Sequence, residues 1–361
     1  MVRGAVMVIM ALDHTRGAWS DASFDIMDVR ITTVALFLTR WITHFCAPVF
    51  VFLAGTGAFL SKKPKPELSK FLVTRGLWLI FLELTLVHFG FYLNLDPHWI
   101  FAQVIWVIGC SMIVMAALIH LPLPAVAAFG IVMVLGHNAF DGVEGNWLWT
   151  FLHVKKRMYP IEGVTFYNMY TLIPWVGVMA AGYAFGAVLR NRTLLLRIGA
   201  AMLGLFVVLR SFNIYGDDRP WSMQPTAVFS LLSFVNTEKY PPSLQFLLMT
   251  IGPAIIAIAL LEKKHDGPLV TFGRVPLFFY LLHTPLIHGS AAVAAWFRYG
   301  GFSFLTQNPS PQGKLYLPPG YGYSLPVVYL VWISVILILY PACKWFAALK
   351  KRRSDAWLSY F

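Results

Sequence analysis

Apolar segments of a length that suits a lipid bilayer recur along the whole chain. The hydrocarbon core of a bilayer is about 30 Å thick, and an α-helix needs roughly 20 apolar residues to cross it. About ten segments fit, at residues 1–17, 34–60, 71–93, 98–119, 123–137, 168–189, 195–212, 243–261, 272–297 and 325–348. The sequence therefore predicts an all-α fold, a polytopic integral membrane helix bundle of about ten transmembrane helices, with residues 1–361 forming one transmembrane domain.

The composition excludes an ordinary soluble domain. Hydrophobic residues make up 58% of the chain and charged residues only 12%, and the mean hydropathy is +0.67, far above what a soluble domain of this length needs. Cys46, Cys110 and Cys343 lie far apart inside apolar segments, so we expect neither a disulfide framework nor a Cys-x-x-Cys metal site. The sequence contains no His-Glu-x-x-His motif, Gly-x-Ser-x-Gly elbow, phosphate-binding loop or dinucleotide fingerprint. We therefore expect no metal.

The basic residues indicate the orientation of the chain in the membrane. More than half of the 28 Lys and Arg residues lie in four clusters, at residues 62–75, 190–197, 263–274 and 344–353. All four fall on one side of the predicted bundle, and the positive-inside rule makes that side cytoplasmic. We predict cytoplasmic N- and C-termini and a location in the cell membrane, which in a bacterium is the inner membrane. The net charge of +12 does not indicate nucleic acid, because a basic, aromatic-rich soluble surface is missing.

The first apolar segment carries ionisable residues at both ends. Arg3 and His14 are eleven residues apart, so on a helix they project from one face about 16 Å apart along the axis, together with Met7 and Met10. If Arg3 lies at one headgroup level, His14 lies near the middle of the membrane, where an ionisable residue is a candidate functional group by default. The alternative is a histidine at the interface where the helix ends.

This segment resembles the first transmembrane segment of a known enzyme family. Its Arg3-Gly4 start and its Asp13-His14-Thr15-Arg16 finish are similar to those of the heparan-alpha-glucosaminide N-acetyltransferase catalytic-domain family, within the wider group of transmembrane acyltransferases. The likeness extends to segments 48–55, 174–177 and 273–288. The resemblance implies that His14 is the catalytic histidine, that Arg3 is nearest the acyl-CoA entrance, and that glucosamine is the acceptor. Family members usually have residues before the Arg-Gly pair, so we leave open whether Met1 is the true start.

Further polar residues in apolar segments are candidates for the same site. Arg40 and His44 are four residues apart on one helical face, where His44 could bind the acceptor or anchor the helix at the interface. Tyr280 and His283 are three apart, and we expect His283 to face the cavity and to act with His14. Asp13 lies about 100° around the helix from His14, so it is better placed to orient a neighbour than to pair with that histidine directly.

Glu83 lies near the middle of the third segment. A carboxyl group at that depth must be paired or protonated, and we expect it to reach a neighbouring helix. It could bind substrate or serve only as a structural hydrogen-bonding group.

In the predicted outer loop 138–167, Trp147 and Trp149 could form a sugar-binding lip or part of an aromatic belt at the membrane surface. The loop 213–242 is long for a connector, and we expect it to cap the outer mouth.

Two classes of function fit these observations. The first is an acyltransferase that moves an acetyl group from cytoplasmic acetyl-CoA to an outward-facing sugar or amino sugar, with His14 as general base or acyl carrier. The second is a transporter of a small polar or sugar-like solute, with the same ionisable residues along its path. A cation suited to CoA phosphates on the cytoplasmic side and a histidine further along the same helix favour the first. The predicted partners are lipid, acyl-CoA, the sugar acceptor and, as an open alternative, a second copy of the chain.

Overall fold

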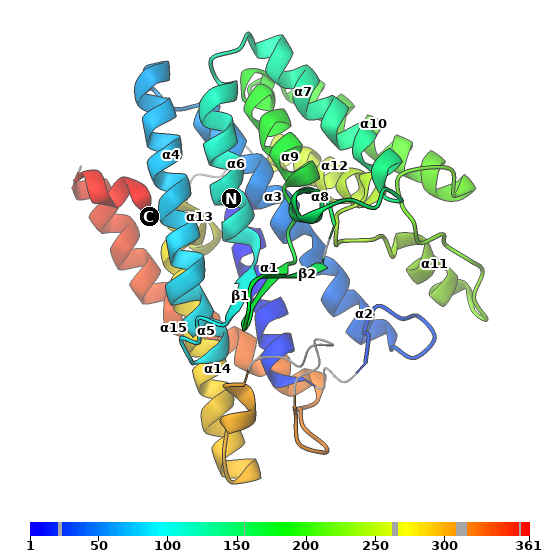
Figure 1. Ribbon diagram of the computed structural model, residues 1–361, viewed down its shortest axis with the longest axis vertical. Helices are drawn as coiled ribbons and strands as arrows, with labels where there is room; N and C mark the ends of the chain where they lie inside the picture. Colours follow the sequence, from blue (N-terminus) through cyan, green and yellow to red (C-terminus); the bar gives the residue numbers. More distant parts are fainter. Residues whose placement is uncertain (21–23, 155, 262–265, 308–315, 354) are drawn as a thin grey trace. The chain divides into compact units, whose positions relative to one another are not determined.

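The structure is a computed structural model that describes residues 1–20, 24–154, 156–261, 266–307, 316–353 and 355–361 (Figure 1). Lys263 and Lys264, which belong to one of the predicted cytoplasmic clusters, lie outside the described residues.

Helices account for most of the described chain. In chain order, the α-helices are α1 Val2–Trp19, α2 Val34–Trp41, α3 Cys46–Phe59, α4 Lys65–Leu82, α5 His88–Tyr92, α6 Val104–Leu118, α7 Leu123–Gly136, α8 Trp147–Leu152, α9 Leu172–Phe185, α10 Arg192–Phe212, α11 Ala227–Val235, α12 Leu244–Leu261, α13 Pro268–Arg274, α14 Pro276–Tyr299 and α15 Leu325–Arg352. A 3₁₀ turn, Ile42–Phe45, joins α2 to α3, and a π-helical turn, Glu83–Val87, joins α4 to α5. The strands are β1 Trp99–Ala102, β2 Lys156–Ile161 and β3 Val164–Asn168.

Each of the ten predicted apolar segments contains a helix. Among the described residues, 7 helices are long and apolar enough to cross a membrane, and Val104–Leu118 and Leu172–Val188 are shorter apolar helices. The helix α1 belongs to neither group because it carries Arg3, Asp13 and Arg16 within its 18 residues. A mostly helical, multi-pass membrane fold is therefore supported by length and composition. The count of ten spans and the cytoplasmic termini stay predictions.

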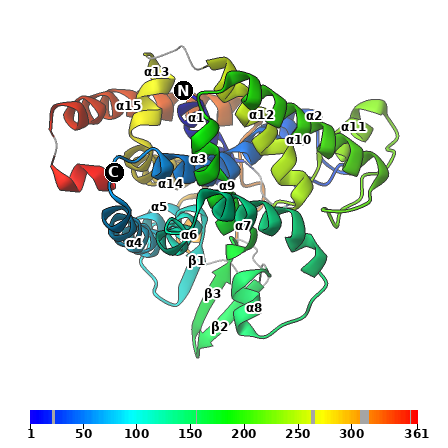
Figure 2. The ribbon, with the colours of Figure 1, turned by 90° about the horizontal axis from the view of Figure 1, so that it is seen from above.

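The all-α prediction missed a small sheet. Its three strands lie in the order β1-β3-β2, and β2 and β3 pair antiparallel with Lys156 opposite Asn168. β3 reads Val-Thr-Phe-Tyr-Asn, and such β-branched and aromatic residues favour strands. The amide nitrogen of Asn168 donates to the carbonyl oxygens of Thr150 and Phe151, which fixes α8 beside the β2–β3 ribbon (Figure 2). The fourth segment also begins later than predicted, since β1 precedes α6.

The described chain divides into two compact units. Unit 1 comprises Met1–Thr43, Leu84–Trp99 and Lys264–Phe361, and unit 2 comprises His44–Glu83 and Ile100–Lys263.

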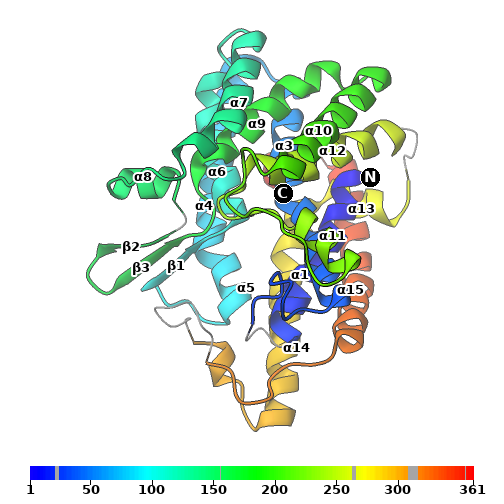
Figure 3. The ribbon, with the colours of Figure 1, turned by 90° about the vertical axis from the view of Figure 1, so that its right-hand side faces the viewer.

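In unit 1, α1 packs against α13, α14 and α15 (Figure 3). The backbone of α1 approaches α13 so closely that a Cβ atom on Gly4 would lie 1.7 Å from the carbonyl oxygen of Leu269. Only glycine fits there. On another side of the helix, the indole nitrogen of Trp332 in α15 donates to the carbonyl oxygen of Val8 at 2.9 Å. These contacts hold the first segment within its unit although its partners are more than 250 residues away in sequence.

In unit 2, α3 and α9 make the closest helix crossing. A Cβ atom on Gly55 would lie 2.0 Å from the carbonyl oxygen of Met179, and one on Gly182 would lie 2.0 Å from that of Phe52. Small residues let two helix backbones approach in this way, which is the common mode of helix association in membranes. α4 packs on α6, α7 on α9, and α10 on α12.

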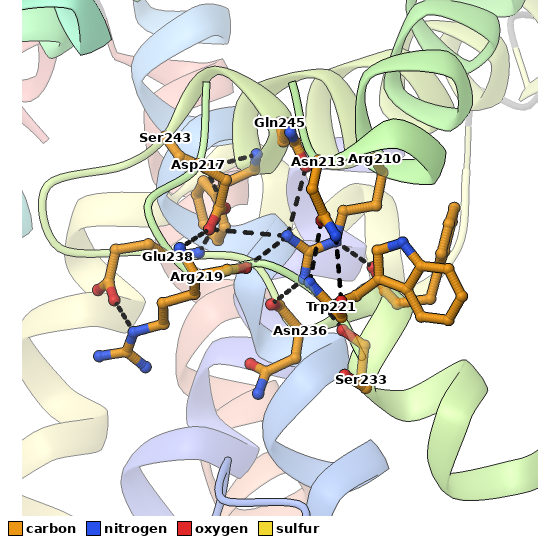
Figure 4. A network of polar contacts seen from close by, with 12 residues as sticks. Arg210, Asn213, Asp217, Arg219, Trp221, Ser233, Asn236, Glu238, Ser243 and Gln245 are labelled. Atoms are coloured by element: carbon orange, nitrogen blue, oxygen red, sulfur yellow. Dashed lines mark hydrogen bonds and ion pairs between the residues drawn. The ribbon is translucent and has the colours of Figure 1, made fainter. Parts of the chain in front are cut away.

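The segment between α10 and α12 is held by one buried arginine (Figure 4). Arg210 is 1% exposed, and its guanidinium donates to the carbonyl oxygens of Arg219, Ser233, Phe234 and Asn236. Its charge also lies 3.7 Å from a carboxylate oxygen of Asp217. Burial raises the pKa of Asp217, although a hydrogen bond from Ser243 acts in the opposite direction. The predicted loop is thus an ordered segment that contains α11.

Candidate active site

Two of the predicted residues, His14 and His283, are in direct contact in unit 1. His14 comes from the last third of α1 and His283 from the first half of α14, two helices that pack together (Figure 3). Nδ1 of His14 lies 2.7 Å from Nε2 of His283, a hydrogen-bonding distance. His283 is fully buried, whereas His14 is partly exposed. The structure thus brings His283 beside His14, whereas the expectations that His283 faces a cavity and acts with His14 stay predictions.

The hydrogen bonds of His283 determine which nitrogen of each neutral ring carries a proton. Nδ1 of His283 lies 2.7 Å from the carbonyl oxygen of Tyr280, and a carbonyl can only accept, so this nitrogen is the donor. In a neutral ring the other nitrogen, Nε2, must then accept, and Nδ1 of His14 must donate to it. The lone pair of neutral His14 is consequently on Nε2.

Aromatic side chains surround the histidine pair. The ring of Phe91 in α5 meets His14 edge-on at a centroid distance of 5.0 Å, and the ring of Tyr280 does so at 6.3 Å. Phe279 stacks on His283 at 5.1 Å. These apolar neighbours fix the ring planes and limit the water around His283. Tyr280, which is one of the predicted site residues, thus lies beside both histidines.

Asp13 is paired with arginines. One carboxylate oxygen accepts a hydrogen bond from Arg16 at 3.1 Å, and the other accepts from Arg40 in α2. The side chains of Asp13 and Arg40 are each 17% exposed. Arg40 also lies within 3.4 Å of the hydroxyl of Thr43. Asp13 therefore orients a neighbour, as its angle on the helix predicted, and the neighbour is Arg40.

Arg3 occupies the opposite end of α1. Its side chain is exposed, and Nε donates to the carbonyl oxygen of Gly273 at the end of α13, at 2.6 Å. This bond uses one of the five N–H donors of a guanidinium. The contact places Arg3 beside the 273–288 segment that the sequence likened to the same enzyme family. His14 and Arg3 thus both contact the α13–α14 region.

The other predicted residues belong to unit 2. Glu83, in the π-helical turn, is 2% exposed and accepts a hydrogen bond from the backbone nitrogen of Trp106 at 2.9 Å. Trp106 lies in the first turn of α6, so the carboxylate caps that helix. The expectation that Glu83 reaches a neighbouring helix is correct. His44 is buried beside the ring of Phe246 at 5.4 Å, and its role in binding stays a prediction.

The loop after α7 contains a cluster that the sequence analysis missed. His137, Asp141 and His153 each present one potential ligand atom, and these atoms lie within 4.8 Å of one another. The signal in the sequence is a His-x₃-Asp-x₁₁-His spacing, which matches no general metal-binding motif.

In the same loop, Trp147 is 73% exposed, while Trp149 donates its indole N–H to the carbonyl oxygen of Val143. The choice between sugar lip and aromatic belt stays open.

One comparison with known proteins yields a match. The family model described as heparan-alpha-glucosaminide N-acetyltransferase, catalytic, matches residues 1–217, more than half of the 361 residues. The matched region contains Arg3, Asp13, His14, Arg40 and Glu83 and ends before α12. His283 therefore lies outside it, although it contacts the matched histidine. No curated protein sequence matches the chain.

Proposed function

Because the chain belongs to the heparan-alpha-glucosaminide N-acetyltransferase catalytic family, a family of membrane acetyltransferases, we propose that it transfers an acetyl group from cytoplasmic acetyl-CoA to an outward-facing sugar. The acceptor group is an amine or a hydroxyl. His14 is the catalytic residue. His283 is the positioning residue, because it accepts a hydrogen bond from Nδ1 of His14 and so keeps the lone pair of that ring on Nε2. The observation that carries the proposal is the hydrogen bond between Nδ1 of His14 and Nε2 of His283.

In a direct transfer, His14 acts as a general base. The acceptor nitrogen or oxygen attacks the carbonyl carbon of the thioester, and its proton passes to Nε2 of His14. The bond between that carbon and the sulfur of CoA breaks, and the imidazolium returns the proton to the departing thiolate. A histidine suits this exchange near neutral pH because its unperturbed pKa is about 6.5. Nε2 of His283 accepts a hydrogen bond from Nδ1–H of His14 throughout and so stabilises the imidazolium that forms.

In a two-step transfer, Nε2 of His14 attacks the thioester itself. CoA leaves as the thiolate, and the acetyl group is carried on Nε2. The acceptor amine or hydroxyl then attacks the acetyl carbon, the bond between that carbon and Nε2 breaks, and the acceptor loses its proton to water. The same nitrogen serves in both routes, because it holds the lone pair. Incubating the enzyme with radiolabelled acetyl-CoA and no acceptor separates them: the two-step route releases one CoA per chain and leaves label on the protein.

The acetyl donor requires a cation on the cytoplasmic side. Arg3 offers four further N–H groups beyond the one bound to Gly273, and a guanidinium binds phosphate oxygens in a fork. We propose that Arg3 contacts the phosphates of acetyl-CoA. Support for the donor contact is the exposure of Arg3 at the end of the helix that carries His14.

The decisive experiment is an acetyl-CoA turnover assay with the purified protein against a panel of amino sugars and neutral sugars. Release of CoA that depends on one of these acceptors, together with acetylated product, is the expected result. If no amino sugar or neutral sugar in the panel is acetylated while the protein is folded, the proposed acceptor class is wrong.

The proposed orientation has its own test. In a background without the three native cysteines, Glu144→Cys should react with a membrane-impermeant thiol reagent added to intact cells, because residues 138–167 face outward. Lys62→Cys should react only after the membrane is opened. Both positions are exposed on the protein surface, so a difference in labelling reports the side of the membrane. The opposite pattern would reverse the orientation.

A further inference from the structure

We propose that His137, Asp141 and His153 in unit 2 form a binding site for a divalent transition-metal ion, with Zn²⁺ as the preferred ion. His137 begins the 3₁₀ turn after α7, Asp141 follows that turn, and His153 directly follows α8. One potential ligand atom from each residue lies within 4.8 Å of the other two. The site is separate from the histidine pair proposed for acetyl transfer and reverses the expectation of no metal.

The burial of the three residues is that of a site open on one side. His137 and His153 are 3% and 2% exposed, whereas the side chain of Asp141 is 30% exposed. Nε2 of His153 lies 2.9 Å from Oδ1 of Asp141. Two imidazoles thus approach from inside the protein, and a carboxylate closes the site toward the surface. An ion can enter past Asp141 without unfolding the chain.

The hydrogen bonding of the imidazoles is incomplete. Among the described residues, neither ring nitrogen of His137 has a hydrogen-bond partner, and Nδ1 of His153 has none either. Buried polar atoms rarely lack a hydrogen-bond partner, so each such case needs an explanation. A neutral imidazole has one nitrogen with a lone pair, and a metal ion coordinated by that nitrogen supplies His137 with one of the two partners that it lacks.

The donor set selects the class of ion. Two imidazoles and one carboxylate are typical of open zinc sites and of some Fe²⁺ sites, whereas Ca²⁺ and Mg²⁺ prefer oxygen ligands. With metal–nitrogen bonds of about 2.0–2.1 Å, donors in a tetrahedral zinc site lie roughly 3.3 Å apart. The His153–Asp141 pair, at 2.9 Å, is already close to that spacing. A pair at the 4.8 Å limit has to contract by at most about 1.5 Å, which is within reach of side-chain rotation. A water or substrate atom would complete the coordination.

The surrounding residues hold these ligands in place. The amide nitrogen of Asn138 donates to Oδ2 of Asp141 at 2.7 Å, and the backbone nitrogen of Leu244 donates to the amide oxygen of Asn138 at 2.8 Å. The ring of Trp149 packs on His153 at a centroid distance of 5.1 Å. Such outer contacts orient metal ligands. They connect the loop after α7 to the start of α12.

The test uses the full chain, purified with an affinity tag that contains no histidine and stripped of metal with EDTA. Co²⁺ is titrated first, because its visible absorption reports low-coordinate binding to nitrogen and oxygen, and Zn²⁺ is then added in competition. We expect saturable binding of one ion per chain and displacement of the Co²⁺ signal by Zn²⁺. A wild-type protein that gives no saturable Co²⁺ signal and retains no zinc after dialysis would overturn the proposal.

Variants assign the binding to these residues. His137→Gln and Asp141→Asn should each weaken Co²⁺ binding at least roughly tenfold, the lower end of what even outer-shell changes cost. Asp141→Asn keeps an oxygen that accepts from His153, so it guards against loss of folding. The matched control is His98→Gln, because His98 and Asp96 form an exposed pair at 2.8 Å that no third ligand joins among the described residues. Equal affinity in wild type and in both cluster variants would show that the ion binds elsewhere.

Discussion

The two histidine pairs of the protein differ in where their ring nitrogens are directed. In unit 1, His14 and His283 are joined nitrogen to nitrogen at 2.7 Å, and the second nitrogen of His283 is bound to a backbone carbonyl. In unit 2, the rings of His137 and His153 meet edge to face at 5.7 Å, and no hydrogen bond links them. Both pairs bring together histidines from different helical elements, yet only the first is joined by hydrogen bonds.

This difference decides what each pair can do. A nitrogen that already donates or accepts a hydrogen bond is oriented for proton transfer, and His283 is engaged on both sides. A buried nitrogen without a partner is instead suited to a ligand from outside the chain, as in the His137 cluster. The comparison predicts that acetyl transfer depends on the first pair and metal binding on the second. Substitutions in one pair should therefore have little effect on the activity of the other.

The largest effect is expected at His14. His14→Ala removes the nitrogen that takes the acceptor proton or carries the acetyl group, so the turnover number should fall by roughly 10²-fold or more. The measurement is CoA release with purified protein at saturating acetyl-CoA. His120→Ala, which changes an exposed histidine, is the matched control and should retain near wild-type turnover. A His14→Ala protein with wild-type activity would exclude the proposed mechanism.

A smaller effect is expected at His283, because it acts through His14. His283→Leu removes the acceptor for the Nδ1 proton of His14, and turnover should fall by roughly tenfold to 10²-fold. His283→Gln places an amide oxygen near the former position of Nε2 and should recover much of that loss. The pH dependence of kcat should also shift in His283→Leu but little in His283→Gln. Equal losses in the two variants would point to packing alone.

The Asp13–Arg40 pair should affect stability more than chemistry. Asp13→Asn leaves a partly buried arginine without its carboxylate, which costs about 1–3 kcal/mol of unfolding free energy. A double-mutant cycle of Asp13→Asn and Arg40→Gln, measured by thermal unfolding in detergent, gives the coupling between them. We expect a coupling of about 1 kcal/mol, the usual size for residues in contact. Additive changes would mean that the pair contributes nothing to the unit that holds His14.

The smallest effect is expected at Arg3. Arg3→Ala should raise the KM for acetyl-CoA severalfold with little change in kcat, since it removes a contact to the CoA phosphates that is equal in ground and transition states. Lys70→Ala removes an exposed cation from the other unit and serves as the charge control. An Arg3→Ala protein with the same KM as the control would remove Arg3 from the donor site.

The sequence predicted the helices and the histidine pair better than the loops. Apolar length locates a membrane helix because it reflects burial in lipid. His283 was found as a partner of His14 because both interrupt apolar helices. The family match then covered the segment with the Arg3-to-His14 spacing.

The loops escaped prediction because their structure depends on long-range contacts. β1 and β3 are four and five residues long, too short for periodicity to distinguish them from the ends of helices. The His137 cluster joins residues separated by a turn and a helix, and its spacing matches no known metal motif. The sequence indicated that Asp13 and Glu83 would have partners but did not identify them, since nothing in it links Arg40 to Asp13 or the backbone of Trp106 to Glu83.

The four carbonyl contacts of Arg210 have a consequence for how the chain tolerates mutation. Every oxygen that accepts from its guanidinium at 3.0 Å or less belongs to the main chain, and main-chain oxygens are present whatever residue occupies positions 219, 233, 234 and 236. Sequence drift at those four positions can therefore proceed without loss of the anchor. Arg210 itself has no substitute, because lysine has a single nitrogen and cannot reach four separate acceptors. A saturation mutagenesis map should show one intolerant position facing a permissive segment.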